Sequence, residues 1–273
     1  MIAVVHSVRD PAGSGAAKAL LDLVGGERAE VAGAEEAYEL STGALLVGFA
    51  EDVIYFEFLA ERLPLAERFV VLSRHSSEAR IKSYTVHFTG NFADEAKFGG
   101  RPGELGYADA AAGLALLRGL AEEAKASGRD KEYRVSYEAT HHGPTGVPRP
   151  LVFVEIGSSP EEWVDVRNHE VLAGSVARFL ESPQVACEPA IGVGGGHYPW
   201  KHTEHALNNG VCYGHIMPKY SLDALSRETL AMMARRTVPA PRLAVVERKG
   251  VNSEGRRIVE EFCREAGLRL AYI

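Results

Sequence analysis

The chain has 273 residues, of which 46% are hydrophobic and 25% are charged. This composition is typical of a globular protein and excludes a disordered or fibrous one. The net charge of −7 argues against a nucleic-acid surface spread over the whole molecule, because phosphate binding needs local positive charge. The charge is uneven, however, since residues 219–273 carry eleven Lys/Arg against seven Asp/Glu. This basic C-terminal part is either a nucleic-acid contact or a solvated helix surface.

Cysteine usage and apolar patterning bear on the cellular compartment. The three cysteines are scattered without a CxxC pair, at Cys187, Cys212 and Cys263. We therefore expect neither a disulfide framework nor a thiolate zinc knuckle, which suits a reducing cytosol. The N-terminus lacks the basic region and cleavage site of a signal peptide, and no apolar stretch approaches the ~20 residues that span a bilayer. The sequence thus predicts a cytoplasmic protein that has no contact with membranes.

Nine short apolar runs are predicted to be strands. In chain order they are Ile2–His6, Ala44–Phe49, Phe69–Leu72, Val86–Thr89, Tyr133–Ala139, Leu151–Ile156, Val211–Ile216, Leu243–Glu247 and Leu268–Tyr272. These runs are unbroken rather than alternating, which is typical of strands buried on both faces of a largely parallel sheet.

Helical patterns fall between these strands. Ser159 with the Pro and two Glu residues that follow it predicts a helix start, and Asn252 and Gly267 predict the ends of a C-terminal helix. The alternation predicts an α/β fold with a mostly parallel or mixed sheet flanked by helices. Since no repeat or linker is present, we expect a single domain over residues 1–273. Residues 183–210, rich in Gly, Pro, His and Asn, are predicted to be a long functional loop.

Chemically versatile side chains repeatedly follow the predicted strands. They are His6, His75 with Ser73 and Arg74, the pair His141–His142, Glu155 and His215. In open α/β sheets ligands bind beyond the carboxyl ends of the strands, so these side chains are expected to converge. A single histidine at a strand end is more often a structural residue whose hydrogen bonds are satisfied. Reactive side chains at five strand ends, however, favour a common site.

The richest cluster is the segment EATHHGPT, residues 138–145. Adjacent residues of a strand face opposite ways, so His141 and His142 reach one site only if the strand ends there, as Gly143 and Pro144 suggest. We expect one of them to be a metal ligand or base and the other to support it; two polar loop histidines are the alternative. Glu155 is expected to be buried, either as a ligand or base or in a structural salt bridge.

Consecutive glycines at Gly194, Gly195 and Gly196 expose backbone N–H groups to a bound anion or developing oxyanion. Several common motifs fail here. A dinucleotide-binding pattern would need glycine at His197, a Walker loop would need glycine at Trp200, and a zincin would need histidine at Ala173. No GxSxG elbow is present. An NAD enzyme, a P-loop NTPase and a serine hydrolase are therefore disfavoured.

A family resemblance rests on six strings distributed over most of the chain. They are SRH (Ser73–His75), HFTGN (His87–Asn91), EATHHGPT (Glu138–Thr145), VEIGSS (Val154–Ser159), GVGGGHY (Gly192–Tyr198) and GHIMPKY (Gly214–Tyr220). Together they resemble the archaeal and plant type of D-aminoacyl-tRNA deacylase. The resemblance implies hydrolysis of the ester that joins a D-amino acid to tRNA, with zinc as the cofactor and an archaeal source. It also implies a fold like those of purine nucleoside phosphorylases, peptidyl-tRNA hydrolase and zinc carboxypeptidases.

Chemistry assigns roles to the centre of the expected site. Zinc would be held by two or three of four side chains: His75, His141, Glu155 and His197. His142 or Glu138 would orient or deprotonate the water that zinc activates. Lys219 and the amides of Gly194, Gly195 and Gly196 would stabilise the oxyanion.

Other residues are expected to bind the substrate. His87, Asn91 and His215 would hold the amino group or the terminal adenosine, Tyr198 would stack on a base, and Lys201 would meet a phosphate. The partner would be a D-aminoacyl-tRNA, and no obligate protein partner is evident. The main alternative is a zinc amidohydrolase or carboxypeptidase-like enzyme acting on a small amide. A nucleoside phosphorylase and a non-enzymatic tRNA- or metal-binding protein are further alternatives.

Overall fold

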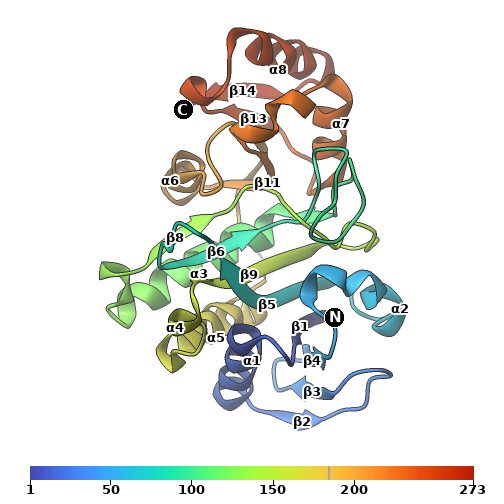
Figure 1. Cartoon of the computed structure of the whole chain (residues 1–273), viewed down its shortest axis with the longest axis vertical. Coiled ribbons are helices and arrows are strands. Elements are labelled where there is room, and N and C mark those ends of the chain that lie inside the picture. Colours follow the sequence, from blue (N-terminus) through green and yellow to red (C-terminus); the bar gives the residue numbers. More distant parts are fainter. Residues whose placement is uncertain (184) are drawn as a thin grey trace.

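A computed structural model describes residues 1–183 and 185–273. Its largest element is an eight-stranded sheet whose strands lie in the order β2-β3-β4-β1-β5-β9-β6-β8 (Figure 1). In that order the strands are Gly26–Arg28, Glu36–Leu40, Leu45–Phe49, Ile2–Ser7, Arg68–Ser76, Leu151–Ser158, Ser83–His87 and Arg134–Tyr137. The central strands β4, β1, β5 and β9 are parallel, whereas β3 and β6 run antiparallel to their neighbours β4 and β9. The predicted α/β fold with a mixed sheet is therefore confirmed.

Helices cover one face of this sheet. They are α1 (Pro11–Val24), α3 (Ala110–Ala126), α4 (Pro160–Trp163) and α5 (Val166–Glu181). Asp10 begins α1 by accepting hydrogen bonds from the amides of Ala12 and Gly13, and Asp109 caps α3 in the same way. The opposite face packs Val71 and Phe153 against Phe56 of η1 (Val53–Phe58) and the short helix α2 (Leu59–Arg62). The site described below lies at the end of this second face.

Helix α1 approaches β5 closely because Gly13 carries no side chain. A Cβ atom at Gly13 would lie 2.3 Å from the carbonyl oxygen of Leu72. We expect Gly13→Ala to lower the free energy of unfolding by about 1–3 kcal/mol, since both backbones are buried and must shift. Urea unfolding measures this, with the exposed Lys18→Ala on the same helix as the control. Equal stability of both variants and the wild type would contradict this close packing.

A second sheet of four parallel strands follows in the C-terminal part, in the order β11-β10-β13-β14. These strands are Val211–Met217, Glu188–Val193, Leu243–Val246 and Arg269–Tyr272, and they are connected by α6 (Trp200–Asn209), α7 (Arg227–Arg236) and α8 (Ser253–Ala266). Helix α3 contacts both sheets. Two short strands, β7 (Ala108–Asp109) and β12 (Thr237–Val238), form a parallel pair. The remaining 3-10 turns are η2 (Arg129–Lys131), η3 (Lys219–Ala224) and η4 (Arg248–Gly250).

Several expected elements take the predicted form. All nine predicted strands are present, with ends that differ by a few residues. Asn252 caps α8 by accepting from the amide of Gly255, and Gly267 ends the helix in the left-handed conformation. The helix expected after Ser159 is divided into α4 and α5, because Asp165 caps a new helix by accepting from the amide of Arg167.

The predicted long loop over residues 183–210 is wrong. Residues Glu188–Val193 form β10 and Trp200–Asn209 form α6, so the connection between these two elements is only the glycine-rich segment 194–199. Glycine and proline within β10 conceal its apolar core, and five polar or charged residues in the first six of α6 conceal its buried face at His202, Thr203 and Ala206. The single-domain boundary over residues 1–273 stays a prediction.

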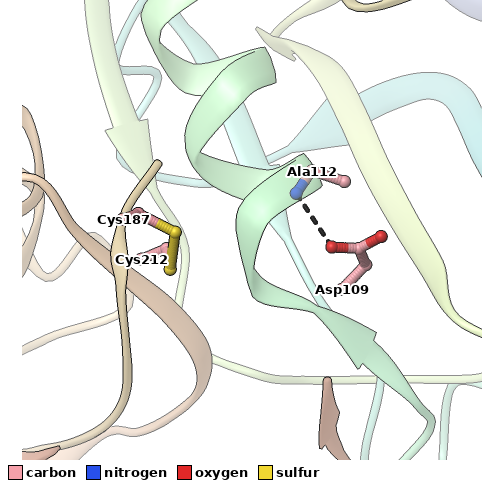
Figure 2. Close-up of a disulfide and its surroundings, with 4 residues drawn as sticks. All are labelled: Asp109, Ala112, Cys187 and Cys212. Carbon is pink, nitrogen blue, oxygen red and sulfur yellow. Dashed lines mark hydrogen bonds between the residues drawn. A yellow bond between two sulfur atoms is a disulfide. The ribbon is translucent and has the colours of Figure 1, made fainter. Parts of the chain in front are cut away.

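The cysteines also differ from expectation. Cys187 and Cys212 form a disulfide, whereas Cys263 is free and buried (Figure 2). The pair is separated by 25 residues in sequence, but Pro189 of β10 lies beside Cys212 of β11 in the register of the second sheet. Only strand pairing brings these cysteines together, so their scattered spacing gave no indication of it. Within the described ranges, no helix has both the length and the apolar character needed to cross a bilayer.

Candidate functional site

Four strands of the large sheet position the chemically versatile side chains. Glu155 of β9 lies between Ser73 of β5 and Thr85 of β6 in the sheet register, and His75 follows two residues after Ser73. Strand β6 is short and antiparallel to β9, so its last residue, His87, lies beside Phe153. Side chains from the last residues of β5, β9 and β6 therefore meet on one face. We predicted that these side chains would meet at a shared carboxyl edge of the sheet, but they meet across one of its faces.

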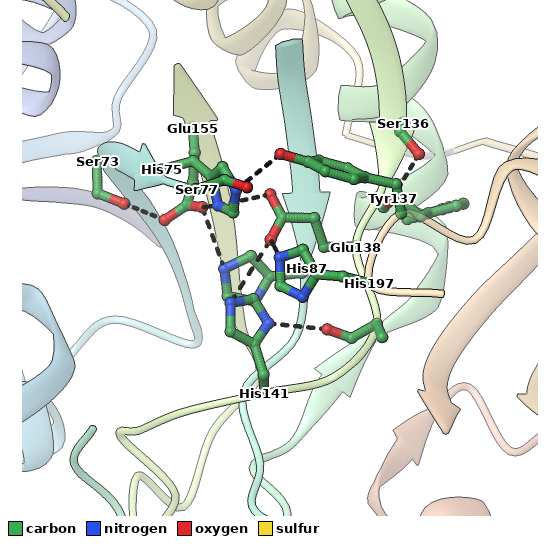
Figure 3. A network of polar contacts seen from close by, with 12 residues as sticks. Ser73, His75, Ser77, His87, Ser136, Tyr137, Glu138, His141, Glu155 and His197 are labelled. Carbon is green, nitrogen blue, oxygen red and sulfur yellow. Dashed lines mark hydrogen bonds and ion pairs between the residues drawn. The ribbon is translucent and has the colours of Figure 1, made fainter. Parts of the chain in front are cut away.

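Glu138, which directly follows β8, is at the centre of the site (Figure 3). Its buried carboxylate lies 2.8 Å from His197 Nε2, 3.1 Å from His75 Nδ1 and 3.5 Å from His141 Nε2. The side chain of Glu138 is 0% exposed, whereas His141 and His197 are 25% and 31% exposed. A substrate must therefore approach from the side of these two histidines.

A second carboxylate, Glu155, lies beside the first. Its Oε2 is 3.4 Å from His75 Nδ1 and 3.6 Å from His87 Nε2, while its Oε1 accepts a hydrogen bond of 2.5 Å from the Ser73 hydroxyl. With His142, whose ring lies 4.4 Å from that of His141, the cluster gains a further imidazole. We call these seven residues the histidine–glutamate cluster: His75, His87, Glu138, His141, His142, Glu155 and His197.

The contacts inside the cluster suit metal ligation better than hydrogen bonding. Both carboxylate oxygens of Glu138 and the Nε2 atom of His87 are buried, and none of them has a hydrogen-bond partner among the described residues. Their neighbours are close, but not in the directions that a hydrogen bond requires. Buried polar atoms without partners are costly, and a bound cation removes that cost.

Three overlapping groups within the cluster could hold a metal ion, because their ligand atoms lie within 4.8 Å of one another. They are His75 with Glu138 and His197, His87 with His141 and His142, and His87 with Glu138 and Glu155. Imidazole and carboxylate are the ligands of catalytic zinc sites, which use three protein ligands. The donor set therefore fits a metal of this kind.

The second nitrogen of each histidine is held by a neighbour. Nδ1 of His141 donates to the carbonyl oxygen of Ala139 at 2.8 Å, and Nδ1 of His142 donates to that of Gly143 at 2.7 Å. A carbonyl only accepts, so these bonds leave the Nε2 lone pair of each ring free for a ligand. His75 Nε2 lies 2.9 Å from the Tyr198 hydroxyl. Such bonds orient metal-binding imidazoles in known metalloproteins.

The electrostatics of the site keep the histidines of one group neutral. Burial, together with the neighbouring His87, lowers the pKa of His142 to about 4. Burial and the same neighbour hold the pKa of His141 well below its usual value. Neutral imidazole is the form that binds metals, so both rings are ready to ligate at neutral pH.

The carboxylates are held ionised. Burial alone would raise the pKa of Glu138, but the charge of His75 outweighs it and the pKa is lowered. The pKa of Glu155 is lowered in the same way by His87. Burial lowers the pKa of His75, yet Glu138 and Glu155 raise it to about 11. Two buried negative charges thus lie inside the cluster and are balanced by the charges of His75 and His87, whose place a bound cation can take.

The glycine-rich segment reaches the cluster through His197. Gly194 and Gly195 adopt left-handed conformations, with φ of 97° and 91°. The Gly194 amide donates to the carbonyl oxygen of Met217 and is therefore already occupied. The amides of Gly195 and Gly196 have no acceptor among the residues that the structure describes. The predicted oxyanion donors are thus reduced to these two amides.

Other predicted site residues lie outside the cluster. The Lys219 side chain is exposed, and its amide donates to the carbonyl oxygen of Gly195. Lys201 lies 3.6 Å from Glu247. His215 is fully buried, with Nδ1 at 3.2 Å from the Thr140 hydroxyl and Nε2 at 3.1 Å from the carbonyl oxygen of Gly106. Nothing in this arrangement supports substrate binding by His215.

Two further predicted residues differ in setting from what we expected. Asn91 braces a loop, because its side-chain amide donates to the carbonyl oxygens of Gly99 and Arg101. His6, the first of the strand-end histidines, pairs with Glu36 at 3.2 Å and does not join the cluster.

Sequence reasoning named Ser73 among the strand-end side chains but gave no role to it or to Tyr220, and both support the cluster. Ser73 bonds Glu155, as described above, and the Tyr220 hydroxyl lies 3.4 Å from His197 Nδ1. Both belong to strings that carry the family resemblance, SRH and GHIMPKY. No local pattern distinguishes them from other hydroxyl side chains, because their partners are distant in sequence.

Known proteins are similar to this chain over its full length. A family model described as D-aminoacyl-tRNA deacylase matches residues 64–271. The D-aminoacyl-tRNA deacylase of Desulfurococcus amylolyticus is 52% identical over 100% of both chains, and that of Staphylothermus marinus is 49% identical over 99% of this chain and 98% of its own. The crystal structure of a conserved protein of unknown function, AF0625, matches with a TM-score of 0.92 and 30% identity, covering 100% of this chain and 95% of that one. The resemblance noted in the sequence is confirmed, and the chain belongs to the D-aminoacyl-tRNA deacylase family.

Proposed function

We propose that this protein hydrolyses the ester bond of D-aminoacyl-tRNA and releases a free D-amino acid and tRNA. The observation that carries the proposal is the histidine–glutamate cluster, which lies within the matched part of a deacylase family member. Because aminoacyl-tRNA is consumed in the cytoplasm, we propose that the protein acts there.

Zinc is the proposed cofactor. Two of the three groups share no residue and are the candidate ligand sets: the first is His75, Glu138 and His197, and the second is His87, His141 and His142. When bound, zinc lowers the pKa of a coordinated water toward ~7 and polarises the ester carbonyl. Glu138 belongs to the first set, where it lies close to His75 and His197, and it also faces His141 of the second set. Its carboxylate is therefore close to both candidate zinc positions.

The remaining residues would manage the proton and the developing charge. If the first ligand set holds the zinc, Glu155 is the carboxylate that does not bind the metal. It is held by the Ser73 hydroxyl and would accept the proton of the attacking water. The amides of Gly195 and Gly196 would donate to the carbonyl oxygen as it becomes negative. The ester bond then breaks and the ribose oxygen leaves with a proton returned by Glu155. This assignment gives Glu155 the role of base, for which the sequence had favoured Glu138 or His142.

The proposal is tested by comparing hydrolysis of D-tyrosyl-tRNA and L-tyrosyl-tRNA by the zinc-loaded protein. We expect the D-ester to be cleaved at least about tenfold faster, the ratio that ~1.4 kcal/mol of discrimination supplies. Radiolabelled tyrosine released per minute is the measurement. Equal rates would contradict chiral selection. If neither ester is cleaved, the small-amide hydrolase becomes the better interpretation.

A further inference from the structure

A cavity of about 500 Å³ lies close to the histidine–glutamate cluster but contains none of its residues. Its walls come from η1 and from two loops, and the residues that line it include Tyr55, Glu57, Lys97, Gly99, Gly100 and Arg101. This volume is within the range of small-molecule binding sites in proteins. None of the residues of the cluster lines it, so the chemistry of the cavity is set by other side chains.

The wall of the cavity is fixed to the cluster through Gly143, the residue after His142. The Gly143 amide donates to the carbonyl oxygen of Phe98 at 3.0 Å. A Cβ atom at Gly143 would lie only 2.2 Å from the amide nitrogen of Gly100, so the two backbones are in direct contact. The cavity wall is therefore one residue away from a candidate metal ligand.

Further hydrogen bonds hold this wall in place. Asn91 donates to the carbonyl oxygens of Gly99 and Arg101 at 3.0 and 3.2 Å, and the Arg101 amide donates to the Thr145 hydroxyl at 2.9 Å. Asn91, expected to touch the substrate, instead shapes this loop. A loop held by three such bonds presents a preformed surface, which lowers the entropic cost of binding.

Aromatic rings are exposed on and next to this wall. Tyr55, which lines the cavity, is 57% exposed, and Phe98, between two of the lining residues, is 67% exposed. Folding gains little from aromatic rings that stay in water, so large exposed rings beside a cavity indicate a binding surface. Exposed aromatic side chains next to cations are typical of sites that bind single-stranded nucleic acid, where bases stack on the rings.

The cations are Lys97 and Arg101. Among the described residues, each pairs with one exposed or half-buried carboxylate: Lys97 with Glu95 at 2.8 Å and Arg101 with Glu104 at 3.5 Å. Surface pairs of this kind contribute little, so a phosphate can replace the carboxylate. The third charged lining residue, Glu57, already accepts hydrogen bonds from the amides of Thr145 and Gly146.

We propose that this cavity binds one base of the single-stranded 3′ end of tRNA, with Tyr55 and Phe98 stacking on the base and Lys97 and Arg101 contacting phosphates. The proposal rests on the proposed function, because it places the nucleic acid that carries the scissile ester beside the cluster. It assigns tRNA recognition to residues 55–101, outside the basic C-terminal part that the sequence suggested.

The first test measures KM and kcat for D-tyrosyl-tRNA with Tyr55→Ala and Phe98→Ala. Each variant is expected to raise KM about 5- to 100-fold, the loss that removal of one stacked ring produces, with kcat within about twofold. Tyr55→Phe should keep the wild-type KM, because it retains the ring. Tyr272→Ala, which removes a tyrosine that is 37% exposed in β14, is the control and should leave KM unchanged.

The second test measures binding of deacylated tRNA with and without its three 3′-terminal nucleotides. Wild-type protein is expected to bind the intact tRNA more tightly, and the Tyr55→Ala/Phe98→Ala double variant should lose that preference. Wild-type turnover with an unchanged KM in both single variants would overturn the cavity assignment alone. Absence of D-tyrosyl-tRNA hydrolysis by wild-type protein would instead overturn the proposed function, and the binding preference would then decide the cavity assignment by itself.

Discussion

Replacing Glu138 by glutamine is expected to lower turnover of D-aminoacyl-tRNA by at least about 10- to 100-fold, the loss found when a side chain that supports a metal site is removed. The substitution keeps the shape of the side chain but removes its charge. Since Glu138 faces His75, His141 and His197 at 2.8–3.5 Å, the loss affects both candidate ligand sets. Zinc content per chain, measured on the same preparations, should fall together with turnover.

The matched control for this variant is Asp109→Asn. Asp109 is also a largely buried carboxylate, 8% exposed, but it caps α3 and pairs with Arg68 at the start of β5, whereas the cluster lies at the end of that strand (Figure 2). Asparagine caps helices about as well as aspartate, so this variant should retain activity within about twofold. If Glu138→Gln also stayed within twofold of wild type, the carboxylate would have no part in the reaction and the site assignment would be wrong.

Removal of the metal is expected to have an effect of similar size. Protein that has been stripped by a chelator should keep below about 1% of its turnover, because the water then lacks the activation that zinc supplies. Zinc should restore activity, whereas magnesium should not, since magnesium prefers an octahedral shell of oxygen ligands. The cluster provides five imidazoles and two carboxylates, which suits zinc.

Metal removal should also lower the melting temperature. A ligand that binds only the folded protein stabilises it in proportion to the logarithm of its concentration over its Kd. In the stripped protein the buried charges of Glu138 and Glu155 are balanced by charged His75 and His87 instead, and such buried ion pairs add little net stability. Full activity and an unchanged melting temperature in protein without measurable zinc would contradict a metal mechanism, while leaving the deacylase reaction possible.

The parts of the fold that the sequence predicted best are those with continuous apolar runs. Strands such as β1, β5 and β9 are buried on both faces, so their composition identifies them directly. Strand β3 was missed because it lies near the sheet edge and has only two buried residues, Ala37 and Leu40, without regular alternation. The strands β7 and β12, with two residues each, are too short to produce a recognisable apolar pattern in the sequence.

The composition of the site could be predicted, but its geometry could not. Histidines and glutamates at strand ends indicated most residues of the cluster, and the four predicted metal ligands all lie in it, whereas His6 and His215 do not. That the cluster binds metal stays a prediction. The convergence of the cluster residues depends on the reversed direction of β6 and β8 relative to β9, which no local pattern encodes. His215 also lies near the end of a predicted strand, as the cluster residues do, but it is buried elsewhere, between Thr140 and Gly106.

The cluster as a metal-binding catalytic centre is tested most directly by anomalous diffraction at the zinc absorption edge on crystals of the zinc-loaded protein. We predict a peak about 2.0–2.2 Å from the nitrogen or oxygen atoms of one ligand set, His75, Glu138 and His197 or His87, His141 and His142. Peaks at both positions would also agree with the account, because Glu138 lies between them. Peaks only at histidines outside the cluster, such as His6 or His205, would contradict it.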